Sequence, residues 1–390
     1  MRNFERNMYI ALELEAAGKS YAVVENGELK VAFGYSEAEE LYYIDRVYRQ
    51  IGVRSASSQD VYRSRVVAEV VKDDDERYQV ALKNGEFKKY EDGYLHLVTT
   101  ERGHIFIPEL PYLVVSNESN SQQTIWNITP MPEIGLSSTI HKALAIQQFL
   151  MHPNVVPFHA NAIVNTETNK SIVFANPAIP GGVKKGGKTT MTLASVVREN
   201  SPFAFFANEN LYLEPDGIRD SVVGVLIPAE INISERSLRE IESDGVELKI
   251  EKYSWDFNSE KHFMISAGAI EDSGYKILGE LPQPAVWTFI QLEPGVQEYA
   301  VFNLSHEEAH TRFVETAKMN RIALFHTPIL QGERFTEANA EINASLEDMA
   351  RQNTGRIFDN LVKNGTDFYL LRGGFDRHKL YELTQRLTQL

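Results

Sequence analysis

The chain contains no cysteine, and this absence excludes disulfide bonds, thiolate metal sites and a cysteine nucleophile. It has no apolar run long enough to cross a bilayer as a helix. Residues 1–6 also lack the apolar core of a secretory signal. We therefore expect a cytoplasmic protein that does not bind a membrane.

Basic residues are scarce relative to acidic ones, since 39 Lys and Arg face 54 Asp and Glu, a formal net charge of -15. Nucleic acids and anionic membranes bind dense patches of Lys and Arg, so this balance argues against a nucleic-acid partner, although a local basic site stays open. Over 390 residues, a hydrophobic content of 43% is enough for a substantial core, arranged as two domains or one elaborated domain.

The most informative motif is a complete G-x-x-x-x-G-K-[ST] string at residues 182–189. In such a loop, glycines let backbone N–H groups surround phosphate oxygens, the lysine reaches the β- and γ-phosphates, and the hydroxyl binds Mg²⁺. Lys188 and Thr189 take the last two roles, so the expected ligands are ATP and Mg²⁺, with GTP left open. The predicted nucleotide-binding residues are Gly182, Val183, Lys184, Lys185, Gly186, Gly187, Lys188, Thr189 and Thr190.

The flanking residues fit this motif, which needs a strand before it and a helix after it. Residues 171–175 are apolar enough for the strand, and residues 190–197 have the composition of the helix. Residues 176–181 separate this strand from Gly182 and include two prolines, which cannot continue a β-ladder. We therefore expect a longer phosphate loop than usual.

The pattern along the chain predicts an α/β protein in two parts. Residues 1–125 form an α+β accessory or substrate-selecting domain with antiparallel strands, including 78–82 and 94–98, and a helix over 36–49. Residues 126–390 form the domain with the phosphate loop. Its expected strands are 155–164, 171–175, 203–210, 222–231, 263–270, 285–292, 300–303 and 368–372, and its expected helices are 137–151, 190–197, 305–318, 337–351 and 377–390.

Three side chains are candidates for chemistry next to the loop. Phosphoryl transfer to a hydroxyl needs a metal site, a neutralising lysine and a carboxylate that orients or deprotonates the nucleophile. Glu209 follows the apolar residues 203–207, where an acid at a strand end would hold Mg²⁺ or act as the base, and Asn208 could orient it. His159 ends an apolar run one strand earlier and is expected near the same edge. The structural alternatives are an exposed strand-end glutamate and a satisfied core or rim histidine.

These residues together resemble the core of the HPr kinase/phosphorylase family, which is similar in turn to the phosphoenolpyruvate carboxykinases. The resemblance covers residues 150–235 and includes a strand with a histidine, a second strand, the phosphate loop, its helix and the Ala207–Asn210 segment. It implies that residues 126–390 contain a P-loop kinase core. By position it assigns phosphate binding to Gly182, Gly187 and Lys188, Mg²⁺ binding to Thr189, the γ-phosphate side to His159, and the family's acidic pair to Asn208 and Glu209.

The asparagine at position 208 departs from the family pattern. An amide cannot act as a base, so Glu209 must supply this function or catalysis is impaired. No counterpart is found for the family's signature segment that grips HPr, so HPr is not the expected substrate. The sequence therefore predicts an ATP-dependent kinase whose hydroxyl acceptor is a small molecule or a peptide serine. The alternative is a non-catalytic or regulatory nucleotide-binding protein, and a homo-oligomer stays open.

Residues 306–310 carry a competing motif, H-E-x-x-H, in which two helical histidines bind Zn²⁺ and the glutamate activates water. This motif makes a zinc metalloprotease the third option, with His326 or Glu333 as a further ligand. Ser305, however, has the pattern of an N-cap, and Glu308 completes a capping box with it. This second pattern predicts an exposed first helical turn rather than a metal centre.

Overall fold

The computed structural model describes residues 20–57 without 28 and 36, residue 60, the stretches 66–71, 98–99 and 104–108, single positions between 137 and 152, and most of 154–389. Within the last range it leaves out 177–186, 217–219, 251–253, 258–259 and 326–335. The chain divides into two compact units. The first comprises Met1–Gln147, Glu251–Met264 and Pro328–Ile342, and the second comprises Gln148–Ile250, Ile265–Thr327 and Asn343–Leu390.

The first unit has a six-stranded sheet in the order β3-β1-β2-β4-β6-β5. β1 and β2 form an antiparallel hairpin whose valines and Phe33 are buried, whereas β2, β4 and β6 are parallel. The strands expected at 78–82 and 94–97, and the domain boundary expected at residue 125, lie outside the described residues. The elements are β1 (Ser20–Asn26), β2 (Leu29–Tyr35), α2 (Ala38–Val47), β3 (Val53–Ser55), β4 (Val66–Val71), β5 (Val98–Thr99), β6 (His104–Pro108) and the hairpin of β14 (Ser254–Phe257) and β15 (Glu260–Ile265).

The second unit is built on another six-stranded sheet, in the order β10-β8-β9-β16-β18-β17. Its members are β8 (Ala160–Asn165), β9 (Lys170–Ala175), β10 (Phe203–Ala207), β16 (Pro284–Leu292), β17 (Ala300–Asn303) and β18 (Asp367–Gly373). β9, β16 and β18 are parallel, and β8 is antiparallel to both β9 and β10. Four strands therefore end at one edge of the sheet, called the carboxyl edge below, and β8 begins there.

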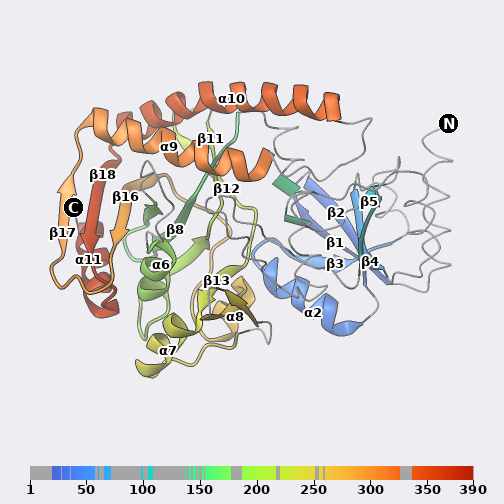
Figure 1. Cartoon of the computed structure of the whole chain (residues 1–390), viewed down its shortest axis with the longest axis horizontal. Helices are drawn as coiled ribbons and strands as arrows, with labels where there is room; N and C mark the ends of the chain where they lie inside the picture. Colours follow the sequence, from blue (N-terminus) through green and yellow to red (C-terminus); the bar gives the residue numbers. More distant parts are fainter. Residues whose placement is uncertain are drawn as a thin grey trace, which may run out of the picture. The chain divides into compact units, whose positions relative to one another are not determined.

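Helices cover both faces of this sheet, as Figure 1 shows. Trp287 of β16 packs on Phe313 of α9, with ring centroids 4.7 Å apart, and Phe313 in turn contacts Phe358 of α10. Leu292 of the same strand lies against Gly187, at the start of α6. These two β16 residues are an odd number of positions apart, so they face opposite sides. The helices are α6 (Lys188–Val196), α9 (His306–Phe325), α10 (Thr336–Lys363) and α11 (Arg377–Gln389).

Smaller elements complete the second unit. A three-stranded sheet contains β7 (Val156–Phe158), β11 (Leu211–Pro215) and β12 (Val222–Val225), with β11 in the middle. The remaining elements are β13 (Ile231–Ser234), α7 (Glu235–Ser243) and α8 (Ala267–Asp272). The chain is thus a mixed α/β protein with parallel and antiparallel strands.

The structure corrects three of the expected strands. The strand expected over 155–164 is two strands, β7 and β8, separated at His159. The one expected over 222–231 ends at Val225, and the next strand, β13, begins only at Ile231. The one expected over 263–270 ends at Ile265, because the side chain of Ser266 accepts a hydrogen bond from Ala269 N and starts α8.

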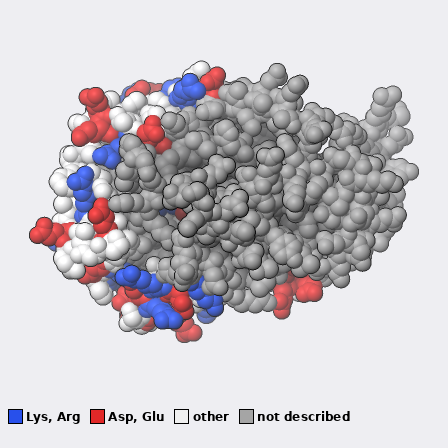
Figure 2. Space-filling view, viewed as in Figure 1, with Lys and Arg blue, Asp and Glu red and all other residues white. Residues whose placement is uncertain are grey.

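Two properties of the surface follow from the described residues. No helix among them is long and apolar enough to span a membrane. Charges of both signs lie close together on the described part of the face in Figure 2. On α7, for example, Arg236 pairs with Glu240 and Arg239 with Glu235, one helical turn apart. On this part of the face, the acidic excess is therefore interrupted by basic side chains rather than gathered in one area.

Candidate functional site at the carboxyl edge

The chain enters β8 and leaves β10 at the same point of the carboxyl edge. β8 and β10 pair with each other there, with Ala162 opposite Ala207. The segments attached to them, β7 and β11, pair in the smaller sheet, with Phe158 opposite Leu211. His159 occupies the crossing in one chain segment and residues 208–210 occupy it in the other. This topology brings His159 and Glu209 together.

The end of the phosphate motif lies at the same edge. Gly187 caps α6 in the left-handed conformation with φ of 84°, and its carbonyl accepts the first helical hydrogen bond from Met191 N. Lys188, Thr189 and Thr190 form the first turn, which has no acidic side chain. Backbone N–H groups at a helix start and the helix dipole both favour an anion. Five predicted nucleotide-binding residues lie outside the described residues: Gly182, Val183, Lys184, Lys185 and Gly186.

Lys188 and Glu209 form a close ion pair, with 2.5 Å between Nζ and Oε1. The Lys188 side chain is only 4% exposed, whereas that of Glu209 is 44% exposed. In the part of the chain that the structure describes, Glu209 is the one side-chain partner of this ammonium group. Burial opposes ionisation of Glu209, but the charge of Lys188 and its hydrogen bond outweigh this effect and lower the pKa of the carboxyl group.

His159 lies near the second carboxylate oxygen of Glu209, with 3.9 Å between its Nδ1 and Oε2. Its backbone N–H donates to the carbonyl of Thr316 on α9, which fixes the crossing against that helix. Burial and the nearby charge of Lys188 lower the pKa of His159 to about 4, although Glu209 acts in the opposite direction. The imidazole is therefore neutral near pH 7 and can accept or donate a hydrogen bond.

The backbone at Glu209 is held in an uncommon conformation, with φ of 63°. It forms the centre of a tight turn in which Asn210 N donates to Asn208 O over 2.7 Å. A non-glycine residue in this region costs on the order of 1–3 kcal/mol, and such strain occurs often at functional sites. This turn follows β10 and carries the Glu209 side chain that pairs with Lys188 of α6.

Asn161 belongs to this site, although the sequence analysis did not select it. Its side chain is fully buried and accepts a hydrogen bond from Glu209 N over 2.9 Å. The signal that could have found it is a polar amide inside the otherwise apolar run of 160–164. A buried polar side chain in such a run requires hydrogen-bond partners, and these partners indicate which segments it connects.

Asn208 is oriented away from the ion pair. It is 2% exposed, and its Nδ2 donates to the carbonyl of Glu230 over 3.4 Å. Its Oδ1 is buried and has no hydrogen-bond partner within the described part of the chain. The structure therefore brings together Lys188, Glu209 and His159, with Thr189 on the next helical position, whereas the side-chain amide of Asn208 bonds to Glu230 instead.

The H-E-x-x-H segment lies elsewhere and is exposed. Ser305 and Glu308 form the expected capping box: Ser305 N donates to Glu308 Oε2 over 3.1 Å, and Glu308 N donates to Ser305 Oγ over 3.4 Å. The rings of His306 and His310 pack edge-on against Phe358, with centroids 5.1 and 4.9 Å away. Among the described residues no group of three or more His, Asp or Glu is arranged to hold a metal. His326 and Glu333 lie outside these residues.

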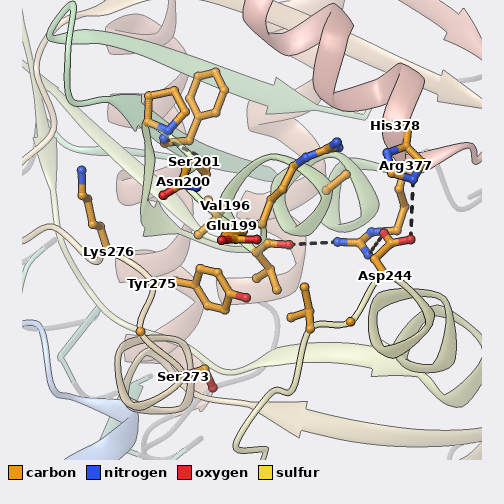
Figure 3. A pocket seen from close by; sticks show the side chains of 18 of the residues that line it. Val196, Glu199, Asn200, Ser201, Asp244, Ser273, Tyr275, Lys276, Arg377 and His378 are labelled. Atoms are coloured by element: carbon orange, nitrogen blue, oxygen red, sulfur yellow. Dashed lines mark hydrogen bonds and ion pairs between the residues drawn. The ribbon is translucent and has the colours of Figure 1, made fainter.

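A cavity of about 980 Å³ lies at the opposite end of α6 from Lys188. Figure 3 shows that Arg377 and His378 both point toward Asp244 there. Arg377 Nη1 lies 2.5 Å from Asp244 Oδ2, and the same guanidinium donates to the carbonyls of Val197 and Glu240. These contacts join the ends of α6, α7 and α11, so Arg377 acts as a structural link.

Comparisons with known proteins add no assignment to this geometry. No protein-family model matches the chain, and no curated protein sequence matches it significantly.

Proposed function

We propose that the protein is an ATP-dependent kinase that transfers the γ-phosphoryl group to a hydroxyl acceptor, through a P-loop kinase core that resembles the HPr kinase/phosphorylase family. The observation that supports it best is the buried Lys188 ammonium group, 2.5 Å from Glu209 at the start of α6. A lysine at this position, with free helical N–H groups beside it, is suited to phosphate oxygens. A carboxylate within reach of the same point is suited to the acceptor proton.

The donor set fits both ATP and Mg²⁺. Phosphates would contact the backbone N–H groups of 187–190 and Lys188, and the hard oxygen donors for Mg²⁺ are the Thr189 hydroxyl and the Glu209 carboxylate. When bound, Mg²⁺ neutralises charge on the phosphates. In the transfer, the acceptor oxygen forms a bond to the γ-phosphorus, the bond from this phosphorus to the bridging oxygen of ADP breaks, and the acceptor proton passes to Glu209.

The ion pair links nucleotide binding to the strength of the base. While Lys188 contacts Glu209, it lowers the pKa of the carboxyl group. Phosphate oxygens compete for the same ammonium group, and once they engage it, the carboxylate loses the contact that weakens it as a base. If Glu209 serves as the base, with Mg²⁺ held by Thr189 and the phosphates, it is therefore a better proton acceptor with nucleotide present than without it. His159, which is neutral, can hydrogen-bond to the carboxylate or the γ-phosphate without adding charge.

The test uses purified protein, γ-labelled ATP and a cell extract as the source of acceptor. Glu209→Gln should retain ATP binding and reduce transfer by about 10²–10⁴-fold, the range expected for loss of a general base. Glu199→Gln, which alters an exposed glutamate at the opposite end of α6, is the matched control and should transfer normally. Full transfer by Glu209→Gln would show that this carboxylate is not the base.

The second candidate function is a nucleotide-binding protein without transfer activity. It is favoured by one observation, the buried amide of Asn208, which donates to the carbonyl of Glu230 and not to the ion pair. Calorimetry with ATP and Mg²⁺ separates the two functions when it is done beside the transfer assay. Binding together with no labelled product from any extract would support this second function.

A further inference from the structure

A buried path of hydrogen bonds connects the helix of Lys188 with the turn of Glu209. Thr192 Oγ1 donates to the carbonyl of Lys188 over 3.0 Å, and Asn161 Nδ2 donates to Thr192 Oγ1 over 3.0 Å. Glu209 N donates to Asn161 Oδ1 over 2.9 Å. Both intermediate side chains, Asn161 and Thr192, are fully buried. Each end of the path is thus the backbone of one member of the ion pair.

The chemistry of an asparagine suits this position particularly well. Its amide offers a donor on one side and an acceptor on the other, and here one serves α6 and the other serves residue 209. β8 lies between β9 and β10, so a side chain on it can reach both the helix after β9 and the turn after β10. An apolar side chain of similar size would leave Glu209 N and Thr192 without these partners. A buried amide in the apolar strand is otherwise a cost to stability.

We propose that Asn161 is a positioning residue that holds the backbone of Glu209 in its left-handed turn and so aims the carboxylate at Lys188 and His159. The role in phosphoryl transfer rests on the kinase function proposed above, whereas the anchoring of Glu209 does not. The hydrogen bond to Glu209 N ties the backbone of the turn to β8, outside the 208–210 segment. Without it, the carboxylate is no longer confined to the point where Lys188 and the acceptor meet.

The anchoring is tested without any assay of activity, by hydrogen exchange of peptides spanning residues 206–211. In Asn161→Leu, the amide of Glu209 should exchange about tenfold faster or more, the ratio expected for loss of one buried hydrogen bond. Thr192→Val removes the other end of the path and should leave this amide protected. Asn165→Ala is the matched control, because Asn165 is a buried asparagine of the same strand that binds Glu167 N and Thr168 N.

The role in transfer is tested by kinetics. Asn161→Leu should lower kcat by about 10–100-fold, as expected for a misplaced catalytic group, and change the KM for ATP by less than about twofold. In the Glu209→Gln background the same change should cost nothing more, because there is no carboxylate left to position. Asn161→Ala serves in both tests if the leucine variant does not fold.

The outcomes separate the two proposals. Unchanged exchange at Glu209 in a folded Asn161 variant overturns the anchoring, whatever the activity. A fall in kcat that adds fully to that of Glu209→Gln overturns the positioning role, because general destabilisation is additive. If exchange responds but the wild-type protein transfers no phosphoryl group, the kinase function fails while the anchoring of Glu209 stands.

Discussion

The two ends of α6 carry ion pairs that look alike but differ in what else the cation contacts. Lys188–Glu209 and Arg377–Asp244 both have a separation of 2.5 Å, a buried cation, 4% and 9% exposed, and a more exposed acid, 44% and 29% exposed. The Arg377 guanidinium also donates to two backbone carbonyls, at Val197 and Glu240. Within the described residues, Lys188 Nζ has only Glu209. A cation with several fixed partners ties elements together, whereas a cation with one exchangeable partner is available for a ligand.

The largest expected effect that could break this comparison is on phosphoryl transfer. Lys188→Ala should reduce kcat/KM by about 10³-fold, because it removes charge stabilisation in the transition state. Arg377→Ala should stay within about threefold when it is assayed at a temperature where it is folded. Parallel rate measurements on the two purified variants check this. Equal losses would show that the distinction between the two ends is wrong.

The next effect is on stability, and here Arg377→Ala should be more harmful than Lys188→Ala. Arg377→Ala leaves Asp244 and two carbonyls without their partner, so it should lower the free energy of unfolding by about 2–3 kcal/mol. Lys188→Ala should lower it by less than about 1 kcal/mol, since the partly exposed carboxylate of Glu209 can be hydrated and a buried ammonium group is removed. Urea titrations of both variants measure the difference. A larger loss for Lys188→Ala would mean that its pair, too, is structural.

A third effect, on the pH dependence of stability, sharpens the comparison at the Lys188 end. The pKa of His159 is about 4 in the folded protein, below its usual value of 6.5, so between these values the unfolded chain binds a proton that the folded chain does not. Stability therefore falls as the pH is lowered through this window, by at most about 1.4 kcal/mol per pH unit. Urea titrations at several pH values should show that His159→Gln loses this slope.

The control for that experiment is His378→Gln, which changes an exposed histidine beside Asp244. It should retain the slope between pH 6.5 and 4. Glu209 contributes in a separate window, because its pKa is lowered. Its contribution is present above the usual value and is lost as the pH falls through the lowered one. An unchanged slope in His159→Gln would show that this histidine is not buried as a neutral group.

The smallest expected effect is at the cavity beside Arg377. Arg198 lies over the ring of Tyr381, with 4.4 Å from Cζ to the centroid. Arg198→Ala should therefore lower the free energy of unfolding by about 0.5–1 kcal/mol and leave phosphoryl transfer unchanged. Thermal denaturation and the transfer assay check the two halves. A clear fall in phosphoryl transfer would show that this cavity has a functional role. The two ends of α6 would then not differ in function.

Much of the second unit could be predicted from local sequence. Strands β9, β10, β16, β17 and β18, and helices α6 and α11, lie where apolar runs and helical periodicity placed them. Helices α9 and α10 begin where they were expected but extend beyond the predicted ends at 318 and 351, to Phe325 and Lys363. The break at His159 could not be predicted, since an apolar run does not show where a chain leaves one sheet for another. The expected strand over 263–270 failed because a serine cap outweighed an apolar pattern.

The candidate site was predictable residue by residue but not as a network. Lys188, Glu209 and His159 each had a local signal, namely a motif, an acid after a strand and a histidine after an apolar run. Asn161 had a signal only in its contrast with its neighbours, because its partners are 31 and 48 positions away. Contacts of this kind are set by the order of strands in the sheet, which local patterns do not specify.

Gly187 has a consequence for how this protein could diverge. Its φ of 84° disfavours any side chain, and a Cβ there would overlap the side chain of Leu292. Packing thus constrains this glycine independently of any ligand, unless position 292 shrinks at the same time. In divergent sequences, a retained glycine at 187 would therefore report on inheritance of the fold. Joint retention of lysine at 188 and glutamate at 209 would be the mark of inherited chemistry.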